Sequence, residues 1–366
     1  MTAAAPRVGI LGGGFMARVH AHAARSARAE LVAIASSSLP RAAEAAAALG
    51  VGTALPDAAA LIAADVDVVH VCTPNTTHAG LAAEAIAAGR HVVCEKPLAT
   101  TVEDAQALVD ALDASGLVGA VPFVYRYHPM VREARARLAA SGQALLSVDA
   151  AYLQDWMLLP GDDNWRAGAA LGGPSRAFAD IGSHLLDLVE FVAGERIVAL
   201  AATTRTVHAH RGDAAVANED IAGVLFRLGG GAVGTALVTQ MAPGRKNALA
   251  IEWHAADASY RFEQERPDEL WIGERAGSRL LQRDPEILSP DAARLSRVPG
   301  GHPMGYQDAF DAFVADAYAA IAGEAPDGLP TFHDGLRAAV LTDAVLRSAA
   351  SGEWIETTAR ARSVAA

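Results

Sequence analysis

The stretch Arg7-Val-Gly-Ile-Leu-Gly-Gly-Gly-Phe-Met-Ala17 decides the fold of the amino-terminal part of this chain. Its first five residues form a short apolar run that is typical of a buried strand, and three glycines follow at once. Helical sequence over 18–29 and a second apolar run over 30–35 come next. Strand, glycine turn, helix and strand within about thirty residues form the setting that a dinucleotide-binding βαβ unit requires.

Each small residue of this turn has a task. Gly12 allows the tight turn, Gly14 lets the backbone approach a pyrophosphate, and Ala17 lets the helix pack close to the strand. The phosphates would then meet the amides of the helix N-terminus, which include those of Phe15 and Met16.

The end of the second strand bears on the choice of cofactor. An acid is expected there when the ribose carries a free 2′-hydroxyl. This chain has Ser36, Ser37 and Ser38 instead, followed by Arg41. Hydroxyls and a guanidinium suit a 2′-phosphate, so the sequence favours NADP, with NAD as the alternative. The competing interpretation places Arg41 on a solvated helix face.

Strands and helices continue to alternate as far as residue 124. We expect strands at 66–71, 90–94 and 118–124 and helices at 41–49, 57–64, 78–89 and 102–115. In an open parallel sheet, ligands bind beyond the carboxyl ends of the strands. The residues there that we expect to contact the cofactor are Thr73, Pro74, Asn75, His78, Glu95 and Lys96.

The pattern changes after Tyr125. A helix over 130–140 and a strand over 144–153 lead into the segment 154–174, whose Trp, Asp and Gly content is typical of a functional loop. Strands are then expected at 197–208, 220–228, 232–241, 248–255, 259–264 and 269–273, and helices at 180–192, 305–322 and 334–350. Successive strands without intervening helices predict a largely antiparallel sheet. One face of such a sheet is free to bury against another subunit, so we expect a homodimer or homotetramer.

The segment 176–187 (RAFADIGSHLLD) holds the second candidate site. Asp180 and His184 are four residues apart, which places an acid and an imidazole on one face of a helix. The alternative is an ordinary pair on a solvated helix. We interpret this segment and Lys96 as two halves of one active site, each supplied by a different domain.

Composition excludes several classes of function. The 366 residues are 52% hydrophobic and 20% charged, and the net charge is −12. With no Lys/Arg-rich run, this argues against a nucleic acid or an anionic membrane as partner. Cys72 and Cys94 form no disulfide framework, and no signal peptide or membrane-length apolar run is evident, so we expect a cytoplasmic protein.

Taken together, these motifs resemble the Gfo/Idh/MocA oxidoreductase family, which includes glucose–fructose oxidoreductase and inositol dehydrogenases. The resemblance rests on the glycine turn, the Glu95-Lys96-Pro97 and Asp180-Ile-Gly-Ser-His184 motifs, and the closing 331–337 run (TFHDGLR). It implies an α/β fold: a Rossmann domain at 1–125, then an α/β domain at 126–358 with an open, largely antiparallel sheet. Residues 359–366 are expected to be a disordered tail.

The resemblance also implies NAD(P)-dependent hydride transfer at a secondary alcohol of a sugar, polyol or inositol. A histidine suits the proton transfer near neutral pH, so His184 is the expected general acid/base. Lys96 would hydrogen-bond the same oxygen, and Asp180 would position the substrate. The family further implies that Trp165, Arg166 and Arg126 lie near the nicotinamide.

The run 152–156 (YLQDW) resembles a subgroup that acts on glucose-like pyranosides and anhydrosugars, often at C3. Gln154 and Asp155 would bind vicinal hydroxyls and Trp156 would stack on a sugar face, with Tyr125 nearby. The alternative for Trp156 is a core residue covering a strand end. The serines with Arg41 also resemble NADP-using anhydrofructose reductases, so the reductive direction stays open.

Three other hypotheses carry less weight. His208 and His210, near Asp213, Glu219 and Asp220, suggest a metal site, but the connecting residues look like a loop and we expect no metal. A catalytically silent cofactor sensor would be expected to lose Lys96 or His184. Glycoside cleavage with recycled NAD is weakened by Ser36 at the position where an acid would bind a ribose.

Overall fold

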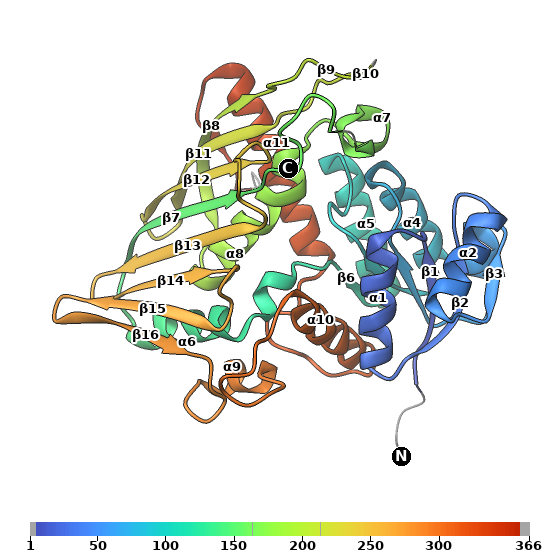
Figure 1. Ribbon diagram of the computed structural model, residues 1–366, viewed down its shortest axis with the longest axis horizontal. Coiled ribbons are helices and arrows are strands. Elements are labelled where there is room, and N and C mark those ends of the chain that lie inside the picture. Colours follow the sequence, from blue (N-terminus) through green and yellow to red (C-terminus); the bar gives the residue numbers. More distant parts are fainter. Residues whose placement is uncertain (1–4, 163, 213, 359–366) are drawn as a thin grey trace, which may run out of the picture. The chain divides into compact units, whose positions relative to one another are not determined.

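The computed structural model describes residues 5–162, 164–212 and 214–358 (Figure 1). The predicted tail 359–366 lies outside these residues. Packing separates two compact units. The first comprises the chain up to residue 128 with segments 168–174 and 302–339, and the second comprises the remainder. The division into domains at 1–125 and 126–358 stays a prediction about folding units, since two later segments pack with the first unit.

The first unit contains a six-stranded sheet in which every strand pair is parallel. In spatial order the strands are β3 (Thr53–Leu55), β2 (Glu30–Ala35), β1 (Arg7–Leu11), β4 (Val68–Val71), β5 (His91–Cys94) and β6 (Gly119–Ala120). The order reverses between β1 and β4, which is where such a sheet binds dinucleotides. The predicted Rossmann fold is therefore confirmed.

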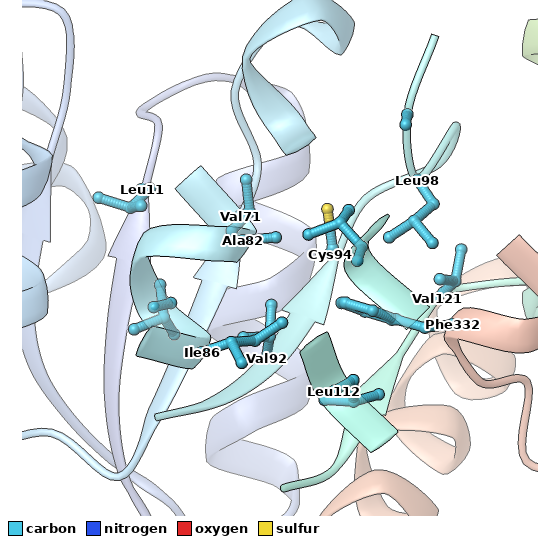
Figure 2. Close-up of a cluster of buried hydrophobic side chains, with 14 of the residues drawn as sticks. Leu11, Val71, Ala82, Ile86, Val92, Cys94, Leu98, Leu112, Val121 and Phe332 are labelled. Carbon is cyan, nitrogen blue, oxygen red and sulfur yellow. The ribbon is translucent and has the colours of Figure 1, made fainter. Parts of the chain in front are cut away.

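Five helices connect these strands in chain order. They are α1 (Phe15–Ser26), α2 (Leu39–Leu49), α3 (Ala58–Ala63), α4 (His78–Ala87) and α5 (Val102–Ser115). Short apolar strands need covered faces, and a cluster of buried side chains from β1, β4, β5 and α5 packs on this sheet (Figure 2). Phe332, far along the chain, lies in this same cluster beside Val121 and Leu112.

The strand predicted at 118–124 is much shorter, since β6 spans only two residues. Pro122 has no amide hydrogen to donate to a ladder. The backbone around it turns to another partner: the Val121 amide donates to the carbonyl of Pro330, and Ala120 forms a bridge with Thr331. A 3₁₀ turn, η2 (Val124–Tyr127), follows.

Two late segments complete the first unit. Helix α10 (Tyr306–Ile321) packs on α1, where Gln307 Nε2 donates to the carbonyl of Val19. The first residues of α11 (Phe332–Ser351) bring Phe332 into the core. The short η1 (Asn75–Thr77) and α7 (Ala169–Gly172) belong here too. No helix in the described part of the chain combines the length and apolar character that crossing a bilayer needs.

The second unit is built on a nine-stranded sheet. Its order is β16-β15-β14-β13-β7-β12-β11-β8-β17, and only the β7–β12 pair is parallel among the pairs described. The largely antiparallel sheet is thus confirmed. The strands are β7 (Leu145–Leu153), β8 (Ile197–Arg205), β11 (Ile221–Leu228), β12 (Val233–Thr239), β13 (Ala248–Ala255), β14 (Ser259–Glu263), β15 (Glu269–Glu274), β16 (Gly277–Gln282) and β17 (Ile355–Glu356).

The remaining elements of the second unit are helical or short. They are α6 (Pro129–Ser141), η3 (Trp165–Ala167), the π-helical turn η4 (Phe178–Gly182), α8 (Ser183–Ala193), α9 (Pro290–Leu295) and the small ribbon of β9 (His210–Arg211) and β10 (Ala214–Ala215). The predicted helix at 180–192 therefore begins inside a π turn. Strand β16 was not expected, since its residues are mostly exposed and carry little apolar alternation.

Candidate functional site

The glycine turn after β1 has the geometry that its sequence predicts. Gly12 has φ of +109°, and its amide donates to the carbonyl of Ala35. A Cβ at Gly12 would lie 2.5 Å from the carbonyl oxygen of Cys72, so only glycine fits here. Apart from Gly14 and its two chain neighbours, no described residue has a heavy atom within 4 Å of where a Cβ on Gly14 would be. The backbone at Gly14 is therefore open to a ligand.

Helix α1 begins directly at this opening. Gly14 is its N-cap, its first turn carries no acidic side chain, and Phe15 is 68% exposed. The first amides of a helix have no partner within the helix and attract anions. The residues present thus fit the pyrophosphate of a dinucleotide, with the amides of Phe15 and Met16 in the first turn.

At the end of β2, a guanidinium and a hydroxyl lie together. Arg41 Nη1 donates to Ser37 Oγ at 3.2 Å, and both residues are exposed. Ser36 is half-buried beside the turn, and its Oγ would be 3.5 Å from a Cβ on Gly13. Arg41 lies on an exposed face of α2, so both the solvated-helix interpretation and the contact with a cofactor stay predictions.

His78 joins the ends of two strands. Its Nδ1 and Nε2 each lie 2.7 Å from a carbonyl oxygen, that of Pro97 and that of Thr73 respectively. Burial lowers the pKa of His78, while these two carbonyls oppose the change. Asn75 Nδ2 donates to the carbonyl of Gly172. In this structure His78 and Asn75 hold backbone in place, and their predicted contact with a cofactor stays a prediction.

Glu95 shapes the turn that carries Lys96. Its carboxylate is buried, with Oε1 3.0 Å from His20 Nε2 and Oε2 accepting from the Lys96 amide at 3.1 Å. Burial raises the pKa of Glu95, but the hydrogen bond from His20 and the nearby charge of Lys96 outweigh it, so the pKa lies below its usual value. An anion is thus fixed beside Lys96.

Asp180 and His184 lie in the second unit, where a π turn leads into α8. The Asp180 amide donates to the carbonyl of Arg176 at 2.8 Å. A Cβ at Gly182 would lie 2.5 Å from the Phe178 ring, so the tight turn requires glycine. Isolated π turns occur frequently at functional sites.

The surroundings of Asp180 and His184 are not those of a solvated helix. His184 is only 8% exposed, so the alternative of a pair on a helix surface is wrong for it. Gln240 Nε2 donates to Asp180 Oδ2 at 2.9 Å, and Arg166 Nε lies 3.5 Å from Asp180 Oδ1. The carboxylate is therefore held by two side chains from other elements.

Glu219 anchors the start of the π turn. Its Oε1 accepts from Ser175 Oγ and from the amides of Arg176 and Phe178, at 2.7, 3.1 and 2.8 Å. Burial raises the pKa of Glu219, and these hydrogen bonds oppose the rise. By sequence alone, Glu219 stands out only as a possible metal ligand. The signal available was an acid directly before an alternating strand.

A buried ion cluster lies next to it. Asp220 Oδ1 contacts Arg176 Nη2 and Arg211 Nη2, and Asp220 Oδ2 accepts from the Val207 amide at 2.5 Å. Arg211 donates in turn to the carbonyls of Met157, Leu159 and Asp162. Burial and then the charge of Arg211 lower the pKa of Arg176 to about 10. The cluster ties the predicted functional loop to the base of the π turn.

Arg166 and Trp165 lie together in η3. The Arg166 guanidinium sits 4.3 Å from the centre of the Trp165 ring, and Arg166 also approaches Asp180. Their contact with a nicotinamide stays a prediction. In the first unit, Arg126 is buried and paired with Asp334 at 2.9 Å, and Tyr125 stacks on His128.

The predicted substrate residues at 154–156 form hydrogen bonds within this run and to the loop around 244–247. Trp156 Nε1 donates to Gln154 Oε1, and Gln154 Nε2 donates to Asn247 Oδ1. Asp155 accepts from Lys246 Nζ at 2.7 Å and from the Gly244 amide. Trp156 packs on the small buried cluster of Met157, Ala167 and Val216. This packing favours the core interpretation for Trp156, while Gln154 and Asp155 stay predictions.

The histidines considered for a metal have other contacts. His208 Nε2 lies 3.0 Å from the carbonyl of Leu158. Within the residues that the structure describes, no group of three or more His, Cys, Asp and Glu side chains is placed to hold a metal ion. Asp213 lies outside those residues.

Known proteins match the chain along most of its length. The GFO_IDH_MocA family model, an oxidoreductase family with an NAD-binding Rossmann fold, matches residues 6–123, and the GFO/IDH/MocA C-terminal domain matches residues 132–261. Levoglucosan dehydrogenase from Pseudarthrobacter phenanthrenivorans is 33% identical over 385 residues, which cover 95% of this chain and 97% of that one.

Solved structures agree. Levoglucosan dehydrogenase in complex with NADH and levoglucosan is similar with a TM-score of 0.90 at 32% identity, covering 96% of this chain and 99% of that one. An inositol dehydrogenase homolog complexed with NAD⁺ from Azotobacter vinelandii has a TM-score of 0.89 at 28% identity, covering 97% and 98%. Both are bound to a nicotinamide dinucleotide.

Proposed function

This chain belongs to the Gfo/Idh/MocA family of oxidoreductases, and from that premise we propose that it acts on one ring hydroxyl of an anhydrosugar or a pyranoside. It is an NAD(P)-dependent oxidoreductase of CH–OH groups in sugars or polyols. The nicotinamide, when bound, accepts or returns the hydride. The identity of the sugar, the carbon that is oxidised and the roles of individual residues are our proposals.

The observation that carries the proposal is the buried His184, one turn from an Asp180 that two side chains hold in place. Removing a hydride from a CH–OH carbon requires that the hydroxyl proton leaves, and a neutral imidazole accepts a proton near pH 7. We assign this proton transfer to His184. Asp180, fixed by Gln240 and Arg166, would bind the substrate and orient it.

Lys96 is the proposed partner on the substrate oxygen. An ammonium group stabilises the negative charge that develops when a hydroxyl loses its proton. Lys96 is half-buried at the exit of β5, and its amide is held by Glu95. A protein that only senses the cofactor has no need for these groups, so their joint presence favours catalysis.

The substrate class comes from the relatives. Levoglucosan dehydrogenase is similar over nearly the whole chain, and levoglucosan is an anhydrosugar. The test is a screen of purified protein, with NAD and NADP separately, against levoglucosan, glucosides, inositols and anhydrofructose, following nicotinamide absorbance. Turnover of a pyranoside or anhydrosugar supports the proposal. Turnover of inositols alone would contradict the proposed substrate class. Tight cofactor binding without turnover of any of these compounds would favour the hypothesis of a catalytically silent cofactor sensor.

We propose that NADP is preferred, because Ser37 and Arg41 converge where no acid is present to repel a 2′-phosphate. Replacing Arg41 by Ala is expected to lower kcat/KM for NADP about tenfold, since one charge-assisted contact contributes about 1.5 kcal/mol. The value of kcat/KM for NAD should stay within about twofold of that of the parent protein. Steady-state kinetics with both cofactors measure the ratio. An equal loss for both cofactors would mean that Arg41 does not contact the 2′-position. A clear NADP preference would also favour the reductive direction.

The exposed face of the second sheet supports a homodimer or homotetramer. Leu225, Val233 and Leu237 are 52%, 55% and 46% exposed, and the strand register places them on one face of β11 and β12. Exposed apolar patches of this kind are typical of subunit interfaces. Replacing Leu237 by Glu is expected to lower the mass measured by light scattering. A monomeric parent protein would overturn the proposal.

We also propose a cytoplasmic location. Cys72 and Cys94 are free thiols, as is usual in reducing compartments. Cell fractionation of the source organism tests this directly.

A further inference from the structure

A chain of four polar side chains runs through the interior of the first unit. Glu95 Oε1 lies 3.0 Å from His20 Nε2, His20 Nδ1 lies 2.8 Å from His70 Nδ1, and His70 Nε2 lies 2.9 Å from the Tyr318 hydroxyl. The groups come from the exit of β5, from α1, from β4 and from α10. Both histidines are fully buried, and the Phe310 ring packs on His20. The proton transfer described above does not use them.

The donors along this chain follow once both rings are neutral, since each neutral ring then has one donor and one acceptor. Between two Nδ1 atoms, one must donate and the other accept. An ionised Glu95 only accepts, so His20 donates from Nε2, and a neutral His20 then accepts at Nδ1. His70 must therefore donate from Nδ1 and accept at Nε2, where the Tyr318 hydroxyl donates. With neutral rings, every bond points toward the carboxylate.

Three of the four groups are held in the protonation state that this assignment needs. Burial lowers the pKa of His70, which keeps its ring neutral. Burial raises the pKa of Tyr318, which keeps its hydroxyl protonated. The pKa of Glu95 is lowered, which keeps it ionised. The other titratable groups that act on Glu95 or on this chain are Cys72, Cys94, His78 and Lys96.

We propose that Tyr318, His70 and His20 are positioning residues, which fix Glu95 as an anion and through it the backbone of Lys96. The inference rests on the proposed role of Lys96. Glu95 Oε2 accepts the Lys96 amide, and His78 contacts the carbonyl of Pro97 on the other side of the same turn. If His20 took the other tautomer, its Nε2 lone pair would face the carboxylate, and Glu95 would have to take up a proton or move.

The direct test is ring ¹⁵N spectroscopy of the histidines in the full-length protein at neutral pH. We expect a neutral His20 protonated at Nε2 and a neutral His70 protonated at Nδ1, the tautomer that is less common in solution. Signals are assigned by the loss of one set each in His20→Gln and His70→Gln. An imidazolium at either position, or His70 protonated at Nε2, overturns the proposal. This readout needs no substrate, so it stands even if the proposed activity fails.

A kinetic test separates positioning from bulk packing. Glutamine at residue 20 can still donate to Glu95, whereas leucine cannot. We expect kcat of His20→Leu to fall about tenfold, the effect of leaving one buried acceptor on Glu95 unsatisfied. The acidic limb of its pH–rate profile should move to higher pH, because Glu95 loses the hydrogen bond that favours its ionised form. His20→Gln should recover most of both. His22→Gln, on the same helix with an exposed ring bonded to Asp311, should match the parent.

Equal losses in the leucine and glutamine variants would contradict the proposal, as would an unmoved pH profile. If His20→Leu does not fold, Tyr318→Phe removes only the terminal hydroxyl. In that variant we expect a smaller fall in kcat together with a mixed tautomer at His70. An unchanged His70 tautomer would show that Tyr318 does not direct the chain.

Discussion

Replacing His184 by Ala is expected to lower kcat for hydride transfer by about a thousandfold, the range of a lost general acid/base. His184 is buried one turn from Asp180, and alanine has no group that can accept or return the proton. Cofactor affinity should stay close to that of the parent, because the glycine turn and α1 belong to the other unit. Stopped-flow absorbance and cofactor titration measure the two quantities.

The pH dependence of the His184→Ala variant adds a second readout. A general base near neutral pH gives a limb in the profile of kcat/KM, and that limb should vanish with the imidazole. The matched control is His333→Ala, an exposed histidine on α11 whose Nε2 lies 3.1 Å from Asp113 Oδ1. If kcat falls by less than about tenfold in His184→Ala, a residue other than His184 must be the general acid/base.

Replacing Asp220 by Asn is expected to cost the second unit about 3–5 kcal/mol in free energy of unfolding, because the change leaves buried arginines without their carboxylate. Arg176 and Asp220 are both fully buried, and Arg211 is nearly so. The π turn that carries Asp180 begins beside Arg176, so activity should fall along with stability.

All five tryptophans lie in the second unit, so their fluorescence during urea unfolding reports on that unit alone. The control is Asp343→Asn, whose exposed pair with Arg347 should contribute less than about 0.5 kcal/mol. Adding Arg176→Met to Asp220→Asn should recover part of the loss, because one buried charge is then removed as well. A loss in Asp220→Asn that matches the control would show that the cluster is solvated.

Local sequence was sufficient for the elements whose conformation is decided within a few residues. The glycine turn, the start of α5 and the end of α4 depend on backbone freedom and on periodicity that neighbouring residues supply. The candidate catalytic groups followed from side-chain chemistry and from a four-residue spacing that survives in the π turn. The largely antiparallel second sheet was predicted from successive runs of alternating apolar and polar residues. This two-residue period can be recognised without knowing which strands pair.

The partners that hold the candidate catalytic groups in place could not be predicted from local sequence. Glu219, Gln240 and His20 act on residues 41 to 75 positions away, and no local pattern marks such partners. The strand predicted at 118–124 ended early because its backbone found a partner at Pro330.

The sequence by itself therefore determined the Rossmann topology, the sheet class and the chemistry available at Lys96, Asp180 and His184. Only the tertiary structure decided that Phe332 completes the first core, that His184 is buried, and that Glu95 is held by a chain ending at Tyr318. The physical reason is that turns and periodicity are short-range properties of the backbone. Burial and hydrogen-bond partners depend instead on which distant segments meet.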